Sequence, residues 1–247
     1  MGKNKLAKFD EMERFENVIQ VPFKKLQQEN FYLKGKWATQ FFENGNPIIL
    51  ELGCGKGEYT VELAEKNPCK NFIGVDIKGA RMYIGAKQAL GKNLKNVAFL
   101  RTNIEIINRF FGAEEISEIW LTFPDPQMKK TKKRLTSTFF LNLYKQFLKT
   151  DGIVHLKTDS NFQFTYTSAL VHLNRFEIQA ESNNLYESEI LDEILQIKTF
   201  YEKQWLSRGI TIKYIAFILN NNEFTEPEIE IEKDEYRSFG RSAKDIH

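Results

Sequence analysis

Short apolar runs alternate with stretches of helical periodicity from about residue 47 onward, and this alternation constrains the fold most strongly. Seven apolar runs have the length of buried strands: 47–52, 71–77, 97–101, 118–123, 152–157, 176–180 and 212–219. Helical patterns lie between them, over 58–66, 79–94, 104–111, 136–149 and 161–174, with another near 200–208. Strands that alternate with helices pair in parallel and carry helices on both faces. The sequence therefore predicts an α/β protein with a seven-stranded, mostly parallel sheet flanked by helices.

The charge of the chain is unevenly distributed. Its 35 Lys and Arg nearly balance 33 Asp and Glu, giving +2, but residues 220–247 carry −4 and residues 1–219 therefore carry +6. We expect three parts: a helical and partly mobile extension over 1–44, the α/β domain over 45–219 and an acidic tail over 220–247. The Glu-Ile alternation at 228–232 fits an edge strand as well as a solvated arm.

Composition excludes several classes of protein. No apolar run approaches the roughly 18 residues of a membrane-spanning helix, and no apolar stretch follows the N-terminal charges as in a signal peptide. Cys54 and Cys69 are too few for a disulfide framework, which favours a cytoplasmic location. His155, His172 and His247 lack the spacing of metal ligands, so we expect no metal site.

A glycine-rich loop follows the first predicted strand, where ligands bind in sheets of this kind. Gly53, Gly55 and Gly57 permit a tight turn and let the backbone approach a ligand closely. Glu58 occupies the third-glycine position of the dinucleotide fingerprint, which argues against a dinucleotide. Glu51, at the end of the strand, suits a cationic amino group better than a pyrophosphate.

Polar residues also follow the second and third predicted strands. Asp76 is placed to accept both hydroxyls of a ribose, and it can also cap the next helix. Asn103 fits contact with an adenine edge and helix capping equally well. With Glu51 at the methionine end, these positions predict a pocket for S-adenosylmethionine. The layout resembles the class I methyltransferases, which have a Rossmann-like sheet.

Asp125 follows the fourth predicted strand between Pro124 and Pro126. The two prolines restrict the backbone and fix one carboxylate beside the proposed methyl donor. A basic run without an acid comes next and predicts contact with the phosphates of a polyanion, although a charge run by itself is usually a solvated surface. Its bases are Lys129, Lys130, Lys132, Lys133 and Arg134.

The motifs together resemble one family, the bacterial tRNA (guanine-N7-)-methyltransferases. They are ELGCGKGEY at 51–59, GVDIKGAR at 74–81, FPDP at 123–126 with its basic run, LKTD at 156–159 and TFYE at 199–202. The resemblance covers roughly 45–219, and FPDP with the basic run is its most specific part. It implies a class I fold and transfer of a methyl group from S-adenosylmethionine to N7 of a guanine in the tRNA variable loop. The alternatives are a methyltransferase for another RNA base or substrate, or a non-catalytic RNA-binding relative.

The resemblance also implies roles for individual residues. Asp125 matches the active-site position, and the positions that bind the cofactor or line the active site are Glu51, Asp76, Asn103 and Asp125, beside the glycines of the loop. Those that bind tRNA are Lys129, Asp159, Thr199, Tyr201 and Glu202. The chain departs from the family pattern at Gln127 and Met128, where Trp is common, and at Trp205, where glycine is common. We expect tRNA as partner, no membrane, and either a monomer or a homodimer.

Overall fold

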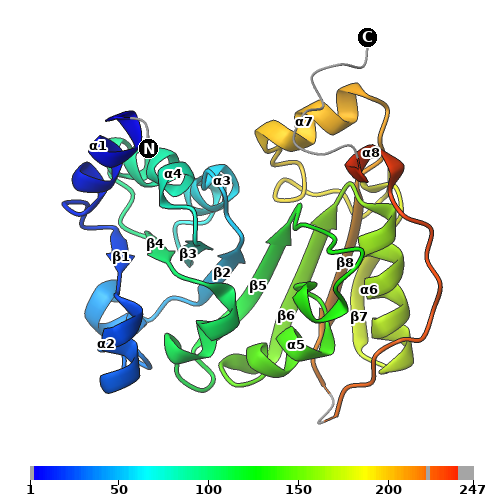
Figure 1. Cartoon of the computed structure of the whole chain (residues 1–247), viewed down its shortest axis with the longest axis horizontal. Helices are drawn as coiled ribbons and strands as arrows, with labels where there is room; N and C mark the ends of the chain where they lie inside the picture. The colour runs from blue at the N-terminus through cyan, green and yellow to red at the C-terminus, as the bar shows by residue number, and fades with distance from the viewer. Residues whose placement is uncertain (1–2, 221–222, 239–247) are drawn as a thin grey trace.

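The computed structural model describes residues 3–220 and 223–238, and its strands form one sheet in the order β1-β4-β3-β2-β5-β6-β8-β7 (Figure 1). The strands are β1 (Val18–Gln20), β2 (Ile48–Leu52), β3 (Asn71–Asp76), β4 (Val97–Arg101), β5 (Ile116–Thr122), β6 (Leu148–Thr158), β7 (Glu177–Ser182) and β8 (Lys213–Ile218). The strands from β1 to β6 pair in parallel, whereas β8 runs antiparallel to both β6 and β7. The predicted architecture is confirmed, but the sheet has eight strands because β1, in the N-terminal extension, joins its edge.

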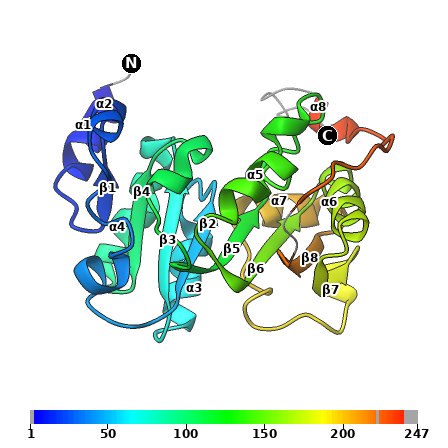
Figure 2. The same cartoon turned by 90° about the horizontal axis from the view of Figure 1, so that it is seen from below.

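Helices pack on both faces of the sheet (Figure 2). They are α1 (Lys3–Met12), α2 (Phe23–Gln28), α3 (Glu58–Lys66), α4 (Gly79–Gly91), α5 (Thr138–Tyr144), α6 (Asn161–Leu173), α7 (Phe200–Ser207) and α8 (Glu235–Ser238). Shorter turns are η1 (Trp37–Phe41), η2 (Ile104–Arg109), η3 (Thr131–Lys133) and η4 (Leu185–Glu187). The helix expected over 136–149 ends at Tyr144, because Leu148 already pairs with Ile116 as the first residue of β6.

The alternation of side chains along each strand builds two cores. In β2, Ile48, Leu50 and Leu52 join the core on the side of α5 and α6, whereas Ile49 joins the core under α3 and α4. Every residue of β2 is buried, which explains why the strand is apolar apart from Glu51 rather than alternating. The sheet thus becomes a rigid platform for the residues at its strand ends.

Parallel pairing brings the carboxyl ends of the central strands to one edge. Glu51 pairs with Gly74 of β3 and Trp120 of β5, and Thr122 pairs with Lys157 of β6. Figure 1 shows α7 lying above this edge. The residues that follow the strands therefore come together although they are distant in the sequence.

The C-terminal residues 223–234 contain no helix or strand and run alongside α6 (Figure 1). The Glu-Ile alternation therefore forms no edge strand, and Ile231 packs partly buried against the core. Across residues 3–220 and 223–238, no helix is both long and apolar enough to cross a membrane. In the same part of the chain, no group of three or more His, Cys, Asp and Glu side chains is arranged to hold a metal ion.

Candidate functional site

A cavity opens at the carboxyl ends of β2, β3 and β5, next to the glycine loop. Its walls are formed by Glu51, Gly53, Cys54, Gly55, Lys56, Glu58, Tyr59, Asp76, Arg81, Thr122, Phe123, Thr199 and Tyr201. The predicted site residues on these walls are Glu51, Gly53, Gly55, Asp76, Thr199 and Tyr201. The other predicted residues lie off the walls: Gly57, Asn103, Asp125, Asp159, Glu202 and the basic run from Lys129 to Arg134.

Gly55 and Gly57 of the loop have different structural roles. Gly55 has φ +56°, and a Cβ added there would meet only the Gly53 carbonyl oxygen at 3.9 Å, so the space beside it is open to a ligand. Gly57 has φ +74°, and a Cβ there would lie 2.6 Å from Phe99 Cε1. Gly57 therefore lets the loop pack on the sheet, and its place in the cofactor site stays a prediction.

Glu51 is a buried acid on the cavity wall, with 3% of its surface exposed. Its carboxylate accepts hydrogen bonds from the hydroxyls of Thr60 and Thr122. Burial raises the pKa of Glu51 to about 7, against the opposing effect of these hydrogen bonds. A cationic group in the cavity would compensate the cost of ionising this carboxyl.

Asp76 and Asn103 both bind backbone amides. Asp76 Oδ2 accepts from the Gly55 N–H at 3.0 Å and its Oδ1 accepts from the Lys78 N–H at 2.7 Å. It therefore ties the glycine loop to the end of β3, and it is not the N-cap of α4, which is Lys78. Asn103 is the N-cap of η2 and accepts from the Glu105 N–H at 3.1 Å. Of the two roles open for Asn103, the structure shows capping.

The loop after β5 holds Asp125 exposed between two unusual backbone positions. Phe123 has φ 50° and Gln127 has φ 47°, in the left-handed region that residues other than glycine rarely occupy. Such conformations cost of order 1–3 kcal/mol and concentrate at functional sites. Asp125 Oδ1 accepts from the Gln127 N–H at 3.0 Å, which orients the carboxylate. Phe123 itself lines the cavity, and Asp125 follows Phe123 by two positions in the chain.

The basic run divides into exposed and buried members. Lys129, Lys130 and Lys132 are exposed, and Lys133 is exposed but forms an ion pair with Glu105. The Arg134 guanidinium is buried over Phe162 and Tyr166, 4.7 Å and 4.3 Å from their ring centroids. It also donates to the carbonyls of Gln127 and Met128, both at 3.4 Å. This side chain therefore supports the loop from inside, and the contact of Arg134 with tRNA stays a prediction.

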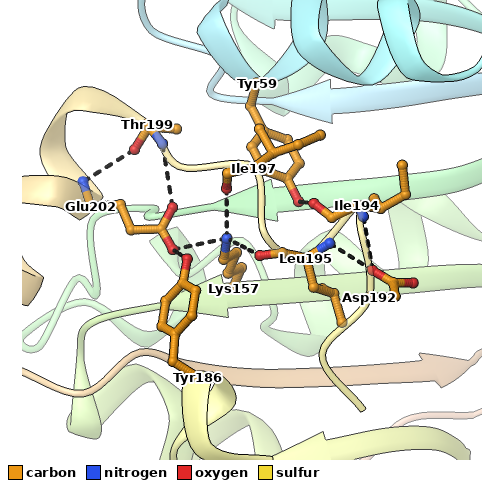
Figure 3. Close-up of polar contacts among 9 residues, drawn as sticks. All are labelled: Tyr59, Lys157, Tyr186, Asp192, Ile194, Leu195, Ile197, Thr199 and Glu202. Atoms are coloured by element: carbon orange, nitrogen blue, oxygen red, sulfur yellow. Dashed lines mark hydrogen bonds and ion pairs between the residues drawn. The ribbon is translucent and has the colours of Figure 1, made fainter. Parts of the chain in front are cut away.

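A buried ion pair joins the end of β6 to the start of α7 (Figure 3). Lys157 Nζ lies 2.8 Å from Glu202 Oε1, and both side chains are 0% exposed. The same ammonium donates to the carbonyls of Leu195 and Ile197, each at 2.8 Å. Burial lowers the pKa of Lys157, and the charge of Glu202 opposes that shift. All three N–H donors of Lys157 are thus directed at oxygen atoms.

Glu202 has further partners within the protein. Tyr186 donates to its Oε1 at 2.6 Å, and Glu202 forms a reciprocal capping box with Thr199 at the start of α7. The carboxylate is enclosed by these donors in this structure, and the contact of Glu202 with tRNA stays a prediction. Sequence reasoning missed Lys157, although a lysine in a buried strand signals a buried partner.

The start of α7 closes over the glycine loop. The Phe200 N–H donates to Glu58 Oε2 at 3.2 Å, and Lys56 Nζ lies 4.1 Å from the Phe200 ring centroid and 5.8 Å from that of Tyr201. The ion pair of Lys157 therefore also determines where Tyr201 meets the cavity.

Asp159, which follows β6, is 1% exposed. Tyr236 donates from its hydroxyl to Asp159 Oδ2 at 2.9 Å and to the Asp159 carbonyl at 3.1 Å. Lys213 Nζ approaches the same carbonyl at 3.4 Å. The C-terminal segment therefore covers Asp159 in this structure, and its direct contact with tRNA stays a prediction.

The mostly parallel sheet, the glycine loop after β2 and the acids at the ends of β2 and β3 define a class I methyltransferase. A solved structure, that of the 16S rRNA methyltransferase KamB, has the same fold with a TM-score of 0.56 at 13% identity, covering 81% of this chain and 95% of that one. The family described as "Putative methyltransferase" matches residues 45–215.

Two relatives define the family more closely. The chain is 57% identical to the tRNA (guanine-N(7)-)-methyltransferase of Bacteroides fragilis, over 99% of this chain and 97% of that protein. It is 56% identical to the protein of the same name from Porphyromonas gingivalis, over 94% and 98% of the two chains. The chain belongs to the tRNA (guanine-N(7)-)-methyltransferase family.

Proposed function

We propose that this protein transfers the methyl group of S-adenosylmethionine to N7 of a guanine in the variable loop of tRNA. The observation that carries the proposal is the cavity that joins Glu51 and Asp76 to Phe123, two residues before Asp125. Residues suited to the cofactor thus line the cavity, and the exposed Asp125 follows one of its lining residues, Phe123, by two positions in the chain. Family membership supplies the substrate class.

The residues of the cavity fit S-adenosylmethionine. Glu51 would pair with the amino group, Asp76 would accept the ribose hydroxyls, and the open side of Gly55 lets the ligand approach the backbone. Asn103 follows β4, on the side expected for the adenine, and would reach it in addition to capping η2. When bound, the cofactor supplies an electrophilic methyl group that guanine N7 accepts through its in-plane lone pair.

Asp125 is the residue proposed to act on the guanine. N7 carries no proton, so the protein needs no general base and contributes mainly positioning and electrostatics. The Asp125 carboxylate can accept hydrogen bonds from the N1–H and the N2 amino group of guanine. It also stabilises the positive charge that the purine gains on methylation. The base must leave its stack to reach Asp125, at a cost of a few kcal/mol.

The surface around Asp125 is suited to the tRNA backbone. Lys129, Lys130 and Lys132 are exposed next to the FPDP loop and can bind phosphates. Thr199 and Tyr201 form the opposite rim. Asp159 and Glu202 are buried behind this rim and would support it from inside.

The test is incubation of unmodified tRNA with S-adenosylmethionine labelled in the methyl group, followed by nucleoside analysis of tRNA fragments. We expect label in 7-methylguanosine from the fragment that carries the variable loop. Label in another nucleoside would point to a methyltransferase for a different base. Binding of tRNA without any label would identify a non-catalytic relative.

A further inference from the structure

The C-terminal residues 223–236, here called the C-terminal strap, follow the whole length of α6 (Figure 1). At the C-terminal end of α6, Asn174 Nδ2 donates to the Thr225 carbonyl at 2.8 Å, and the Thr225 N–H donates to Asn174 Oδ1 at 2.7 Å. These paired hydrogen bonds fix where the strap begins its course along the domain.

Two acids of the strap accept hydrogen bonds from the starts of helices. Glu226 Oε1 accepts from the Thr138 N–H at 2.9 Å and from its hydroxyl at 2.8 Å. Asp234 is 6% exposed, and it accepts from the Phe162 N–H at 3.1 Å and from the Ser160 hydroxyl. Carboxylates are favourable at these positions because the free N–H groups of a helix start need acceptors. The strap is therefore anchored by specific contacts and is not a loose acidic arm.

The contacts of Glu226 and Asp234 hold the strap so that Tyr236 lies at the carboxyl end of β6. Its hydroxyl donates to Asp159, and its ring packs against Trp205 of α7, with centroids 5.4 Å apart at 60°. Tyr236 thus bridges the residue after β6 and the helix whose first turn carries Thr199 and Tyr201. Both connections lead to the substrate side of the cavity.

We propose that the C-terminal strap supports the side of the cavity that faces tRNA, here called the substrate side, which includes Asp159 and the first turn of α7. In this proposal Tyr236 is a positioning residue for the methylation of tRNA. The inference rests on the proposed function. The Tyr236 hydroxyl fixes the Asp159 carboxylate, and the ring buttresses α7 through Trp205. Tyr236 is not among the residues that line the cavity, and its hydroxyl and ring contact Asp159 and Trp205, so we expect its effect on the tRNA side rather than on cofactor binding.

The test compares Tyr236→Phe, which removes only the hydroxyl, with Tyr32→Phe, which changes a tyrosine that is 61% exposed near α2. A lost hydrogen bond to a carboxylate predicts about a tenfold fall of kcat/KM for tRNA in Tyr236→Phe. We expect the Kd for S-adenosylmethionine to stay within about twofold, and Tyr32→Phe to match the unaltered chain. A purely structural role would instead lower the melting temperature and leave kcat/KM of the folded enzyme unchanged.

Three outcomes would overturn the inference in different ways. An unchanged kcat/KM in both Tyr236→Phe and Tyr236→Ala would remove Tyr236 from the substrate side. A higher kcat/KM would show that the strap covers Asp159 and competes with tRNA. If the unaltered chain forms no 7-methylguanosine, the proposed function itself fails, and the inference falls with it.

Discussion

The two sides of the cavity are built in different ways. On the cofactor side, Glu51 and Asp76 lie at the ends of adjacent strands, and their hydrogen-bond partners belong to the sheet or to the segments that directly follow β2 and β3. On the substrate side, Asp159 and Glu202 are buried, and each is held by a side chain from another part of the chain. The contrast indicates that the cofactor side is held within the sheet and its adjoining segments, whereas the tRNA side depends on contacts made by α7 and the C-terminal strap.

The largest expected effect comes from breaking the buried ion pair of the substrate side. Lys157→Met should lower the free energy of unfolding by about 3–5 kcal/mol, because it leaves the Glu202 carboxylate buried and unpaired. Urea denaturation followed by circular dichroism measures this change. Lys203→Met, on the exposed face of α7, is the matched control and should stay within about 0.5 kcal/mol. A similar small effect for Lys157→Met would mean that the pair does not hold α7.

The next effect concerns Asp125, the carboxylate proposed to act on the guanine. Asp125→Asn should reduce kcat about 100-fold, as the loss of a preorganised electrostatic contact does, while the affinity for S-adenosylmethionine is retained. Single-turnover methylation of tRNA and calorimetry measure the two quantities. Asp151→Asn, an exposed acid at the other end of β6, is the control. Near-normal turnover of Asp125→Asn would exclude Asp125 from the chemistry.

A pH effect of intermediate size is specific to the cofactor side. Because burial raises the pKa of Glu51 to about 7, binding of a cationic amino group below that pH must first ionise the carboxyl. The affinity for S-adenosylmethionine should therefore rise about tenfold between about pH 5.5 and 7, below the titration of the ligand's own amino group. Calorimetry across this range should give a flat profile for Glu51→Gln.

The same raised pKa makes the stability of the ligand-free protein fall as the pH rises, whereas the affinity for S-adenosylmethionine rises over the same range. The protonated Glu51 stabilises the fold fully below its unfolded pKa of 4.5, and this contribution is lost as the pH rises through about 7. A pH-independent affinity in the unaltered chain would contradict the pairing of Glu51 with the cofactor.

The smallest expected effect concerns the exposed lysines of the substrate side. Lys129→Ala combined with Lys130→Ala should lower the slope of log Kd for tRNA against log salt by about two, one for each lost phosphate contact. Filter binding at several salt concentrations measures the slope. Lys66→Ala with Lys149→Ala, near the amino ends of the strands, is the matched control. Equal slopes for both double variants would show that the lysines beside Asp125 do not contact the RNA.

More of the predicted cofactor residues than of the predicted tRNA residues line the cavity, and the difference has a physical reason. The helix over 58–66 and the strand over 97–101 coincide with α3 and β4, because apolar periodicity is a local property. Strand β1 has only three residues and leaves no such pattern. The contact between Tyr236 and Asp159 joins residues 77 positions apart, and no local pattern encodes such a partner.

The most direct test of the central claim, that Glu202 acts by positioning through Lys157, is a double-mutant cycle with Lys157→Met and Glu202→Gln. Each single change leaves one buried charge unpaired, whereas the double change removes both and keeps an amide able to cap α7. We predict that the double variant regains at least about 2 kcal/mol of unfolding free energy relative to the sum of the single losses, with a parallel gain in kcat/KM for tRNA. Strictly additive losses in both quantities would contradict the account and would return Glu202 to direct contact with tRNA.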